Sequence, residues 1–275
     1  MSDQYTDRFS RNIGVLTNEE QKKLRETTVG IAGVGGVGGL LAERLLRMGI
    51  GRVKLSDPGD FEVSNLNRQF GSDVDTLGRK KAEVVAEQIR LINPDASIEW
   101  DVQGIESSES AETFVRQCDL VIDEMDYGAW KESIYLQRAA RNNGIHYLFS
   151  GAIGFGALLS NFAPDGITLE EYNGLTPGQD LESIQVGTVA SDKVLPVVPT
   201  YASHAMPMEM VQEILQGLRP VPTCSVGVGL AAVLAANEAV NTILKRMEIA
   251  AAPEFIYIDL MDKVFRVGAL SSEKQ

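Results

Sequence analysis

The chain has 275 residues, with 38 acidic and 25 basic side chains and a net charge of −13 at pH 7. This balance argues against a DNA-binding or anionic-membrane surface, because phosphate-rich partners are bound by basic patches. Two cysteines, Cys118 and Cys224, are too few for a disulfide framework and are typical of a reducing compartment, so we expect a cytoplasmic protein. No secretory signal pattern is visible, and no apolar run reaches the ~18 residues of a membrane helix.

The first 27 residues are polar and precede the first predicted strand. Thr17 followed by Glu20 forms a capping-box pattern, which predicts a short helix ending near Thr27. Arg8 and Arg11 lie ahead of this helix, and isolated charges of this kind are usually solvated surface residues. From these residues alone, the segment is an N-terminal arm without an assigned function.

A glycine-rich loop follows the apolar run at residues 29–32 and precedes an amphipathic run at 40–48. The loop contains Gly33, Gly35, Gly36 and Gly38 in a GxGxxG spacing. Glycines let a backbone approach a phosphate closely, and the helix that follows presents free N–H groups to the anion. A plain packing turn between strand and helix would also explain the glycines. Asp57 ends the next apolar run and can accept hydrogen bonds from ribose, which favours a nucleotide but leaves NAD, FAD and ATP open.

A polar string after Asp57 distinguishes among these nucleotides. It contains Asn65, Asn67, Arg68 and Gln69 and is followed by three cations, Arg79, Lys80 and Lys81. Nucleotidyl transfer requires cations at the α-phosphate and the leaving pyrophosphate, whereas hydride transfer does not. The alternative is that residues 79–81 are the solvated first turn of a helix predicted over 79–92.

Carboxylates follow the predicted buried strand at residues 120–122. Asp123, Glu124 and Asp126 leave this strand at its carboxyl end, the edge where ligands bind in open α/β sheets. Magnesium takes one or two carboxylates together with phosphate oxygens, so Asp126, or else Asp123, is a candidate ligand. The alternative is that Asp126 caps a helix predicted over 129–142.

The remaining elements are less strongly patterned. We expect strands at 98–102 and 145–149, helices at 207–217 and 230–246, and a hairpin formed by 255–260 and 263–267 at the sheet edge. The glycines of segment 150–156 suggest either a bend between strands or the passage of a substrate tail. Residues 164–207 have few periodic stretches and are interpreted as a long loop, which is usually functional or mobile. Cys224 is interpreted as a small buried residue rather than a reactive thiol.

The string from Asp57 to Gln69, with Gly78 and Lys81, resembles the ThiF/MoeB/HesA family, relatives of the ubiquitin-activating enzymes. The resemblance extends from about Tyr5 to Leu270 and is weakest over 163–222. It implies an ATP-dependent adenylyltransferase that activates the C-terminal carboxylate of a small ubiquitin-like or sulfur-carrier protein or peptide. It implies nucleotide binding by Gly33, Gly35, Gly36, Gly38, Asp57, Asn65, Asn67, Arg68, Gln69 and Lys81, and catalysis by Arg11, Arg68, Lys81 and Asp126.

The same resemblance implies ATP and Mg²⁺ as cofactors, with Asp126 organising the metal. It also implies a homodimer in which Arg11 reaches the neighbouring site. This chain departs from the family in three ways: it has no CxxC pairs, no cysteine between residues 163 and 207, and Asp126-Tyr127 in place of Asp-Asn. We therefore expect no zinc and no thioester at the usual place. The acceptor of the acyl group is then sulfide, an amine or an atom within the substrate, the last suiting RNA- or peptide-modifying relatives.

The resulting expectation is one Rossmann-like, doubly wound α/β domain with a mostly parallel sheet and antiparallel C-terminal strands. Its parts are an arm (1–27), a nucleotide-binding core (28–162), a crossover and substrate region (163–222) and a C-terminal helix and hairpin (223–275). Two other classes stay open: an NAD-dependent oxidoreductase, and a non-catalytic binding partner that keeps the fold. The former leaves Arg68 and Lys81 unexplained, and the intact set of site residues argues against the latter.

Overall fold

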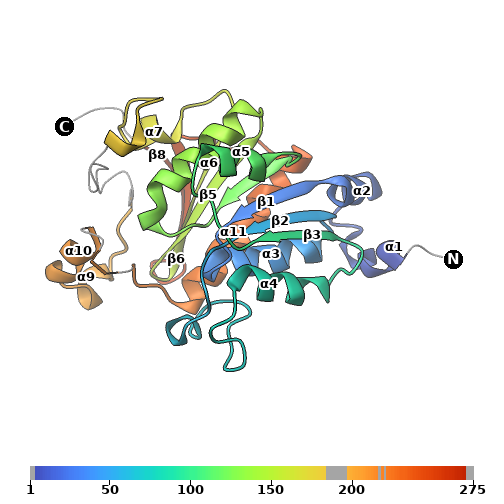
Figure 1. Ribbon diagram of the computed structural model, residues 1–275, viewed down its shortest axis with the longest axis horizontal. Helices are drawn as coiled ribbons and strands as arrows, with labels where there is room; N and C mark the ends of the chain where they lie inside the picture. Colours follow the sequence, from blue (N-terminus) through green and yellow to red (C-terminus); the bar gives the residue numbers. More distant parts are fainter. Residues whose placement is uncertain (1–3, 184–196, 216–217, 220, 271–275) are drawn as a thin grey trace.

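A computed structural model describes residues 4–183, 197–215, 218–219 and 221–270. Its centre is an eight-stranded sheet in the order β3-β2-β1-β4-β5-β6-β7-β8 (Figure 1). The strands are β1 (Thr28–Ala32), β2 (Arg52–Ser56), β3 (Ser97–Asp101), β4 (Leu120–Asp123), β5 (His146–Ile153), β6 (Gly156–Phe162), β7 (Glu254–Asp259) and β8 (Val264–Ala269). The first five run parallel and the last three pair antiparallel, which confirms the predicted fold class and the C-terminal hairpin.

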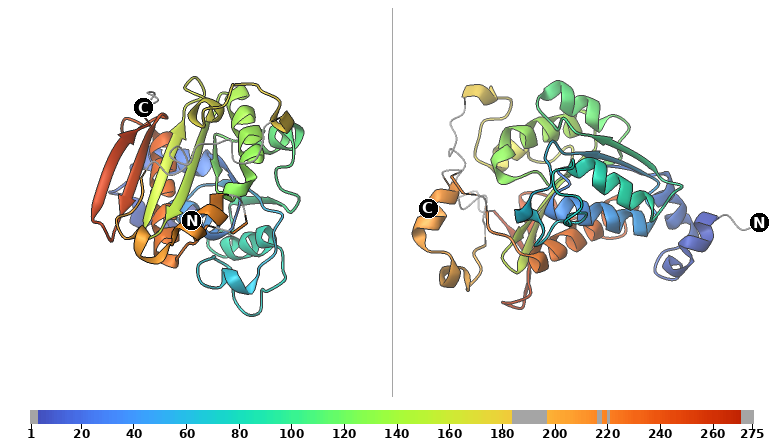
Figure 2. Two further views of the ribbon diagram at one scale, coloured as in Figure 1. Left: turned by 90° about the vertical axis from the view of Figure 1, so that its left-hand side faces the viewer. Right: turned by 60° about the horizontal axis from the view of Figure 1, so that its bottom comes forward.

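Helices cover both faces of the sheet, because alternate side chains of each central strand point to opposite faces. Val29 and Ile31 of β1 enter one core, together with α3 (Gly36–Met48), α4 (Lys81–Arg90) and α11 (Ser225–Leu244). Ala32 of β1 and Val121 of β4 enter the other, against α5 (Ser108–Val115) and α6 (Trp130–Asn142). Figure 2 shows α11 beside α3 on one side of the sheet.

The N-terminal arm consists of α1 (Gln4–Arg8), a 3-10 turn η1 (Ser10–Asn12) and α2 (Asn18–Glu26). The capping box predicted at Thr17 is confirmed, because its hydroxyl accepts from the Glu20 N–H while the Glu20 carboxylate accepts from the Thr17 N–H. The Tyr5 hydroxyl donates to the Gly49 carbonyl at 2.6 Å, and the Gln21 amide donates to the Met48 carbonyl at 2.9 Å. These bonds attach the arm to the C-terminal end of α3.

Several boundaries differ from those predicted. Helix α3 begins at Gly36, within the glycine loop, and α11 begins at Ser225 rather than at residue 230. Helix α5 was not predicted, because its sequence is mostly polar and carries few apolar positions. The crossover region contains short elements: α7 (Leu169–Tyr172), η4 (Leu181–Ser183), α9 (Ala202–Ala205) and α10 (Met208–Leu215). Part of the long loop predicted at 164–207, and the end of the helix predicted at 207–217, lie outside the described residues.

Helix α11 is the one described helix that is long and apolar enough to span a membrane by length and composition. In its most apolar window, 61% is buried inside the fold, where the helix packs against α3, β5 and β6. A core helix of a soluble domain has this character, because such a helix is apolar over most of its surface.

Candidate active site

The site lies at the carboxyl ends of β1 and β4, which are neighbours in the sheet. The chain runs outward from β1 to β2 and β3, then returns to β4 on the other side of β1. Such a topological switch point leaves a crevice for ligands at the strand ends in open α/β sheets. The glycine loop leaves β1 here, and the N-terminus of α3 begins at Gly36.

Close packing explains two of the loop glycines. Gly33 has φ +85°, and a Cβ on it would lie 2.4 Å from the Glu124 carbonyl oxygen at the end of β4. A Cβ on Gly38 would lie 1.9 Å from the carbonyl oxygen of Gly33. The loop is therefore folded onto itself and onto the segment that carries the acidic residues, with no room for a side chain at either position.

Asp57 holds the glycine loop in place. Its side chain is 7% exposed, Oδ2 accepts the Val34 N–H at 2.8 Å, and Oδ1 accepts the Gly59 N–H at 2.8 Å. Each carboxylate oxygen has two acceptor sites. One site on each oxygen is therefore occupied by a backbone N–H, which leaves acceptor capacity for the ribose hydroxyls expected from the sequence.

Lys81 is the first residue of α4, and its backbone N–H donates to the Gly59 carbonyl at 3.0 Å. A Cβ on Gly59 would lie 3.0 Å from Asp57 Oδ1 and 3.3 Å from Lys81 Nζ. The ammonium group and the carboxylate thus converge on the same glycine, beside the start of the phosphate loop.

The three cations at 79–81 divide into two kinds. Arg79 pairs with Glu87 and Lys80 with Asp60, at 2.8 and 2.9 Å. Lys81 makes no side-chain hydrogen bond or ion pair with any part of the chain that the structure describes. The solvated-surface interpretation therefore fits the first two cations, and only Lys81 is available to a ligand.

Arg68 lies beside the first turn of α3. Its Nη1 donates to the Ser64 carbonyl at 3.0 Å and to Asn67 Oδ1 at 2.8 Å. A Cβ on Gly36 would be 3.7 Å from Arg68 Nε. The guanidinium is thus held by local bonds at the helix N-terminus, where an anion is favoured.

The two remaining amides of the polar string differ in their bonding. Asn65 is used within its own turn, because its Oδ1 accepts the Glu62 N–H at 2.9 Å and its Nδ2 donates to Ser64 Oγ at 3.4 Å. Gln69 is 8% exposed, and its amide nitrogen lies 3.5 Å from the position of a Cβ on Gly35. Its buried Oε1 has no hydrogen-bond partner in the described ranges. An unpaired buried acceptor beside the phosphate loop fits a site that awaits a donor from a ligand.

The carboxylates after β4 have distinct environments. Asp123 is fully buried, accepts from the Tyr147 hydroxyl and from the Met125 N–H, and has its pKa raised by that burial. Glu124 accepts from Ser150 Oγ at 2.6 Å, and burial raises the pKa of its carboxyl well above the usual range. Neither group is presented to a metal ion.

Asp126 is exposed, and its side chain forms no capping bond to the 3-10 turn η3 (Tyr127–Ala129) that follows. Asp126 therefore does not cap this turn with its side chain, and its exposed carboxylate follows shortly after the end of β4. No group of three or more His, Cys, Asp or Glu side chains suited to a metal occurs in the part of the chain described. One or two carboxylates suffice for magnesium when phosphates supply the other ligands, so Asp126 fits that role.

The start of α11 also borders the site, which the sequence did not predict. A Cβ on Gly36 would lie 3.3 Å from Val228 Cγ1, and Asn67 Nδ2 donates to the Thr223 carbonyl at 3.3 Å. The signal that could have revealed this contact is Gly227, where a Cβ would come within 2.2 Å of a carbonyl oxygen in the β5–β6 turn. A glycine early in a helix marks such a close approach.

The glycine-containing segment 150–156 is the end of β5 and the turn into β6, so the bend between strands is confirmed. The carbonyl of Gly154 accepts from Cys224 Sγ at 3.2 Å. The Tyr201 hydroxyl donates to Asp259 and accepts the Phe155 N–H, both at 2.7 Å. This turn therefore connects the crossover region, the hairpin and the start of α11.

Arg11 is not brought to the crevice within one chain. It lies on η1, which packs at the C-terminal end of α3, whereas the phosphate loop is at the N-terminal end. A helix of 13 residues separates the two by roughly 20 Å at 1.5 Å per residue. Nearby Arg8 pairs with Asp95 at 2.8 Å, while Arg11 is exposed and makes no side-chain bond within the described ranges.

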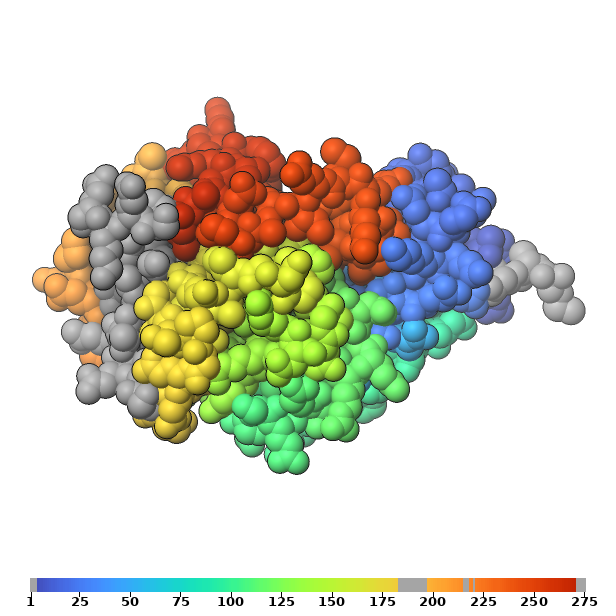
Figure 3. Space-filling view, turned by 90° about the horizontal axis from the view of Figure 1, so that it is seen from above, coloured from blue at the N-terminus to red at the C-terminus, as the bar shows by residue number. Residues whose placement is uncertain are grey.

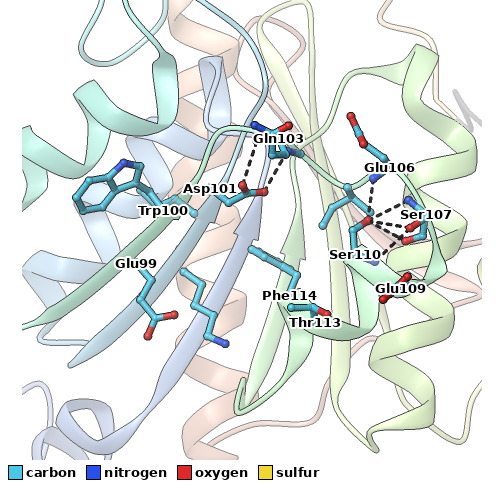
Figure 4. A pocket seen from close by; sticks show the side chains of 14 residues that line it. Glu99, Trp100, Asp101, Gln103, Glu106, Ser107, Glu109, Ser110, Thr113 and Phe114 are labelled. Carbon is cyan, nitrogen blue, oxygen red and sulfur yellow. Dashed lines mark hydrogen bonds between the residues drawn. The ribbon is translucent and has the colours of Figure 1, made fainter.

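A groove of about 490 Å³ lies between β2, β3 and α5 (Figure 4). Its charged lining residues are mostly acidic, with Glu99, Asp101, Glu106 and Glu109 against the single cation Lys54. Such a lining repels a triphosphate. The phosphates are therefore assigned to the crevice at β1 and β4 and not to this groove.

The fold and site define an α/β protein with a Rossmann-type glycine loop, close to which lie Lys81, the locally bonded Arg68 and the exposed Asp126. The chain belongs to the ThiF family, which it matches over residues 9–275. It is 32% identical over 152 residues to a tRNA threonylcarbamoyladenosine dehydratase of Haemophilus influenzae, covering 55% of this chain and 58% of that protein. It is 30% identical over 166 residues to the sulfur carrier protein ThiS adenylyltransferase of Escherichia coli, covering 60% and 65%. The chain spans about half the length of the curated relatives it matches.

Among solved structures, the chain is similar to E. coli MccB with ATP, with a TM-score of 0.72 and 19% identity over 95% of this chain and 71% of that one. It is also similar to PaaA, with a TM-score of 0.70 and 18% identity over 98% and 74%. These likenesses agree with the predicted fold class.

Proposed function

We propose that this protein is an ATP-dependent adenylyltransferase. A substrate carboxylate attacks the α-phosphate of ATP, a bond forms between a carboxylate oxygen and phosphorus, and pyrophosphate leaves with the electron pair of the broken P–O bond. The product is an acyl-adenylate, which a second nucleophile converts to product and AMP. No general base is required, because a carboxylate is already ionised at neutral pH.

The observation that carries the proposal is that Lys81, unlike its neighbours Arg79 and Lys80, forms no ion pair in the described part of the chain. Arg79 and Lys80 are paired with acids, whereas Lys81 has no such pair and lies beside Gly59 and Asp57, and Arg68 is held by local bonds near Gly36. Cations at these two positions stabilise the charge that develops on the α-phosphate and the pyrophosphate. Hydride transfer to or from nicotinamide does not require cations at these positions.

The other residues complete the assignment. Asp57 accepts from the ribose hydroxyls, Gln69 contacts the nucleotide beside the glycine loop, and Asp126 would hold Mg²⁺ together with the phosphates. Such a metal would neutralise phosphate charge, and Lys81 adds to that effect. Every one of these roles uses a side chain with unfilled bonding capacity in the described part of the chain.

For the substrate, we propose the C-terminal carboxylate of a small ubiquitin-like or sulfur-carrier protein or of a peptide. The similarity to a ThiS adenylyltransferase supports this choice, as does the net charge of −13, which disfavours a nucleic acid. A second candidate is a carboxylate carried on tRNA, favoured by the similarity to tRNA threonylcarbamoyladenosine dehydratases. We also propose that the protein functions as a homodimer in the cytoplasm.

ATP–pyrophosphate exchange tests the proposal. Purified protein with Mg²⁺ is assayed with carrier proteins, with peptides encoded beside it, and with tRNA. We expect one of these to stimulate exchange and Lys81→Ala to reduce it about 10²- to 10³-fold, as for loss of one transition-state donor. Lys80→Ala is the matched control and keeps exchange, because Lys80 is paired with Asp60. Tight binding of NAD without binding of ATP would contradict the proposal.

A further inference from the structure

A second pocket lies at the amino ends of the strands, on the opposite side of the sheet from the crevice. Its volume is about 240 Å³, and it is bordered by the arm and by the starts of β2 and β3. The five residues of β1, about 16 Å in length, separate it from the phosphate loop. In Figure 3 the blue N-terminal segment is at one end of the molecule, and the yellow and orange crossover residues are at the other. The pocket is therefore separate from the crevice and from the crossover region.

Arginine side chains make this pocket positive. Arg25 of α2 and Arg52 at the start of β2 both line it, and Asp95 is the one acid among its described lining residues. Arg8 adjoins the same wall, because its Nη1 donates to Asp95 Oδ2 at 2.8 Å and to Asn93 Oδ1 at 2.7 Å. Three guanidinium groups thus gather around one carboxylate, in a chain whose net charge is −13. Such a local excess of positive charge favours an anion.

The two lining arginines are held in position by uncharged groups. Arg52 Nε donates to Thr28 Oγ1 at 2.8 Å, and its Nη2 donates to the Glu26 carbonyl. Arg52 forms no ion pair with any residue that the structure describes. The guanidinium carbon of Arg25 lies 4.5 Å from the centroid of the Tyr5 ring. A guanidinium fixed through part of its fork keeps its other donors directed at a phosphate or carboxylate.

Asn93 contributes an unused donor to the wall of the pocket. Its side chain is 1% exposed, and its Oδ1 accepts from Arg8. The buried Nδ2 has no hydrogen-bond partner among the described residues. Few buried donors stay unpaired in folded proteins, and this one fits a site that takes an acceptor from a ligand. An oxyanion offers acceptors only, which suits walls made of guanidinium and amide donors.

Size and charge narrow the class of anion. The volume of about 240 Å³ is below the ~300–1,000 Å³ of pockets that take drug-sized ligands, so the ligand is small. Phosphate groups carry nearly two negative charges at neutral pH and three strong acceptor oxygens, whereas a carboxylate carries one charge and two oxygens. Arginine also pairs with phosphate through two parallel bonds. A lining with two guanidinium groups therefore favours a phosphate-like dianion.

We propose that this pocket binds a small dianionic oxyanion, inorganic phosphate or the phosphate of a monoester, through Arg25, Arg52 and Asn93. The anion bridges the arm, through Arg25 of α2, to the core, through Arg52 of β2. It also offsets the repulsion among the three guanidinium groups and so fastens the arm to the sheet. Binding at this pocket does not depend on the proposed function, and its test requires no turnover.

Calorimetric titration of the full chain with inorganic phosphate tests the binding, at mildly alkaline pH and at an ionic strength kept constant with chloride. Arg52→Gln should weaken binding at least about tenfold, as for loss of one hydrogen bond to a charged group. Arg266→Gln, at an exposed arginine of β8, is the matched control and binds phosphate as the wild type does. Lys81→Ala, altered at the crevice, should also bind as the wild type does, which separates the two sites.

Asp95→Asn should have the opposite effect. It removes the acid from the lining and releases Arg8 from its ion pair, so phosphate should bind severalfold more tightly. A residue that only supported the arm would not strengthen binding when replaced. A wild type that binds no phosphate, an Arg52→Gln variant that binds as the wild type does, or weaker binding by Asp95→Asn would each overturn the proposal.

Hydrogen exchange and tRNA complete the test. Phosphate should slow amide exchange in α2 and leave α10, at the other end of the molecule, unchanged. Equal exchange in α2 with and without phosphate would contradict the fastening of the arm. The backbone of a nucleic acid carries similar phosphate chemistry, so tRNA is titrated in parallel. Equal tRNA binding by the wild type and Arg52→Gln supports a small anion as the ligand, whereas weaker tRNA binding by this variant, without binding of free phosphate, overturns it.

Discussion

Replacement of Gly33 by alanine tests the packing of the phosphate loop. Gly33 has φ +85°, a region that costs a residue with a Cβ roughly 1–2 kcal/mol. The new Cβ would also lie 2.4 Å from the Glu124 carbonyl oxygen, a backbone atom that moves only with the strand end. Overpacking of this kind costs about 1–3 kcal/mol. Together these terms predict a loss of roughly 2–5 kcal/mol in the free energy of unfolding.

For a chain of this size, that loss corresponds to a fall of roughly 5–15 °C in melting temperature, measured by calorimetry or circular dichroism. Gly35→Ala is the matched control in the same loop, because its Cβ meets nothing closer than the Gln69 amide nitrogen at 3.5 Å. Its melting temperature is expected within about 2 °C of wild type. Equal melting temperatures for Gly33→Ala and wild type, or an equal fall for both variants, would refute the packing argument.

Three further variants have distinct expectations. Burial raises the pKa of Glu124 in the folded chain, so wild-type stability is lost as pH rises through that pKa. Glu124→Gln keeps an acceptor for Ser150 and cannot ionise, so its melting temperature should exceed that of the wild type by more at pH 8 than at pH 5. An equal difference at both pH values would contradict this sign. Asp126→Asn should leave stability unchanged and raise the Mg²⁺ concentration for half-maximal exchange about tenfold, and an unchanged Mg²⁺ dependence would remove Asp126 from the metal site. Cys224→Ser keeps the hydrogen bond to the Gly154 carbonyl and should retain product formation in a complete assay. Loss of product formation in this variant would point to an acyl-thioester on Cys224.

The arrangement of the sheet was predictable because its signals are local. The continuous buried runs of β1 and β4, the glycine loop and the capping box at Thr17 are all properties of short segments. Helix α5 was not predicted because its sequence is mostly polar and gives no clear helical period. Its few apolar side chains are buried by packing against α6, which is not a local signal. Local pattern is a sufficient guide only where burial leaves a period in the sequence.

The site was predictable in composition but not in geometry. Motif spacing pointed to Lys81, but only the ion pairs of Arg79 and Lys80 explain why it alone remains free. The contact between Val228 and Gly36 joins segments nearly two hundred residues apart, and nothing in either segment encodes the other. The position of Arg11 likewise depends on how the arm packs against α3, which is a tertiary property.

The transfer of an oxygen atom tests adenylation most directly. Once the activating substrate is identified by exchange, its carboxylate is labelled with ¹⁸O and the complete reaction is run to AMP. Attack of the carboxylate on the α-phosphate leaves one carboxylate oxygen on phosphorus, so the AMP released by the second step carries ¹⁸O, seen as a mass increase in its phosphate. Unlabelled AMP, or ADP and phosphate as the products, would contradict the account.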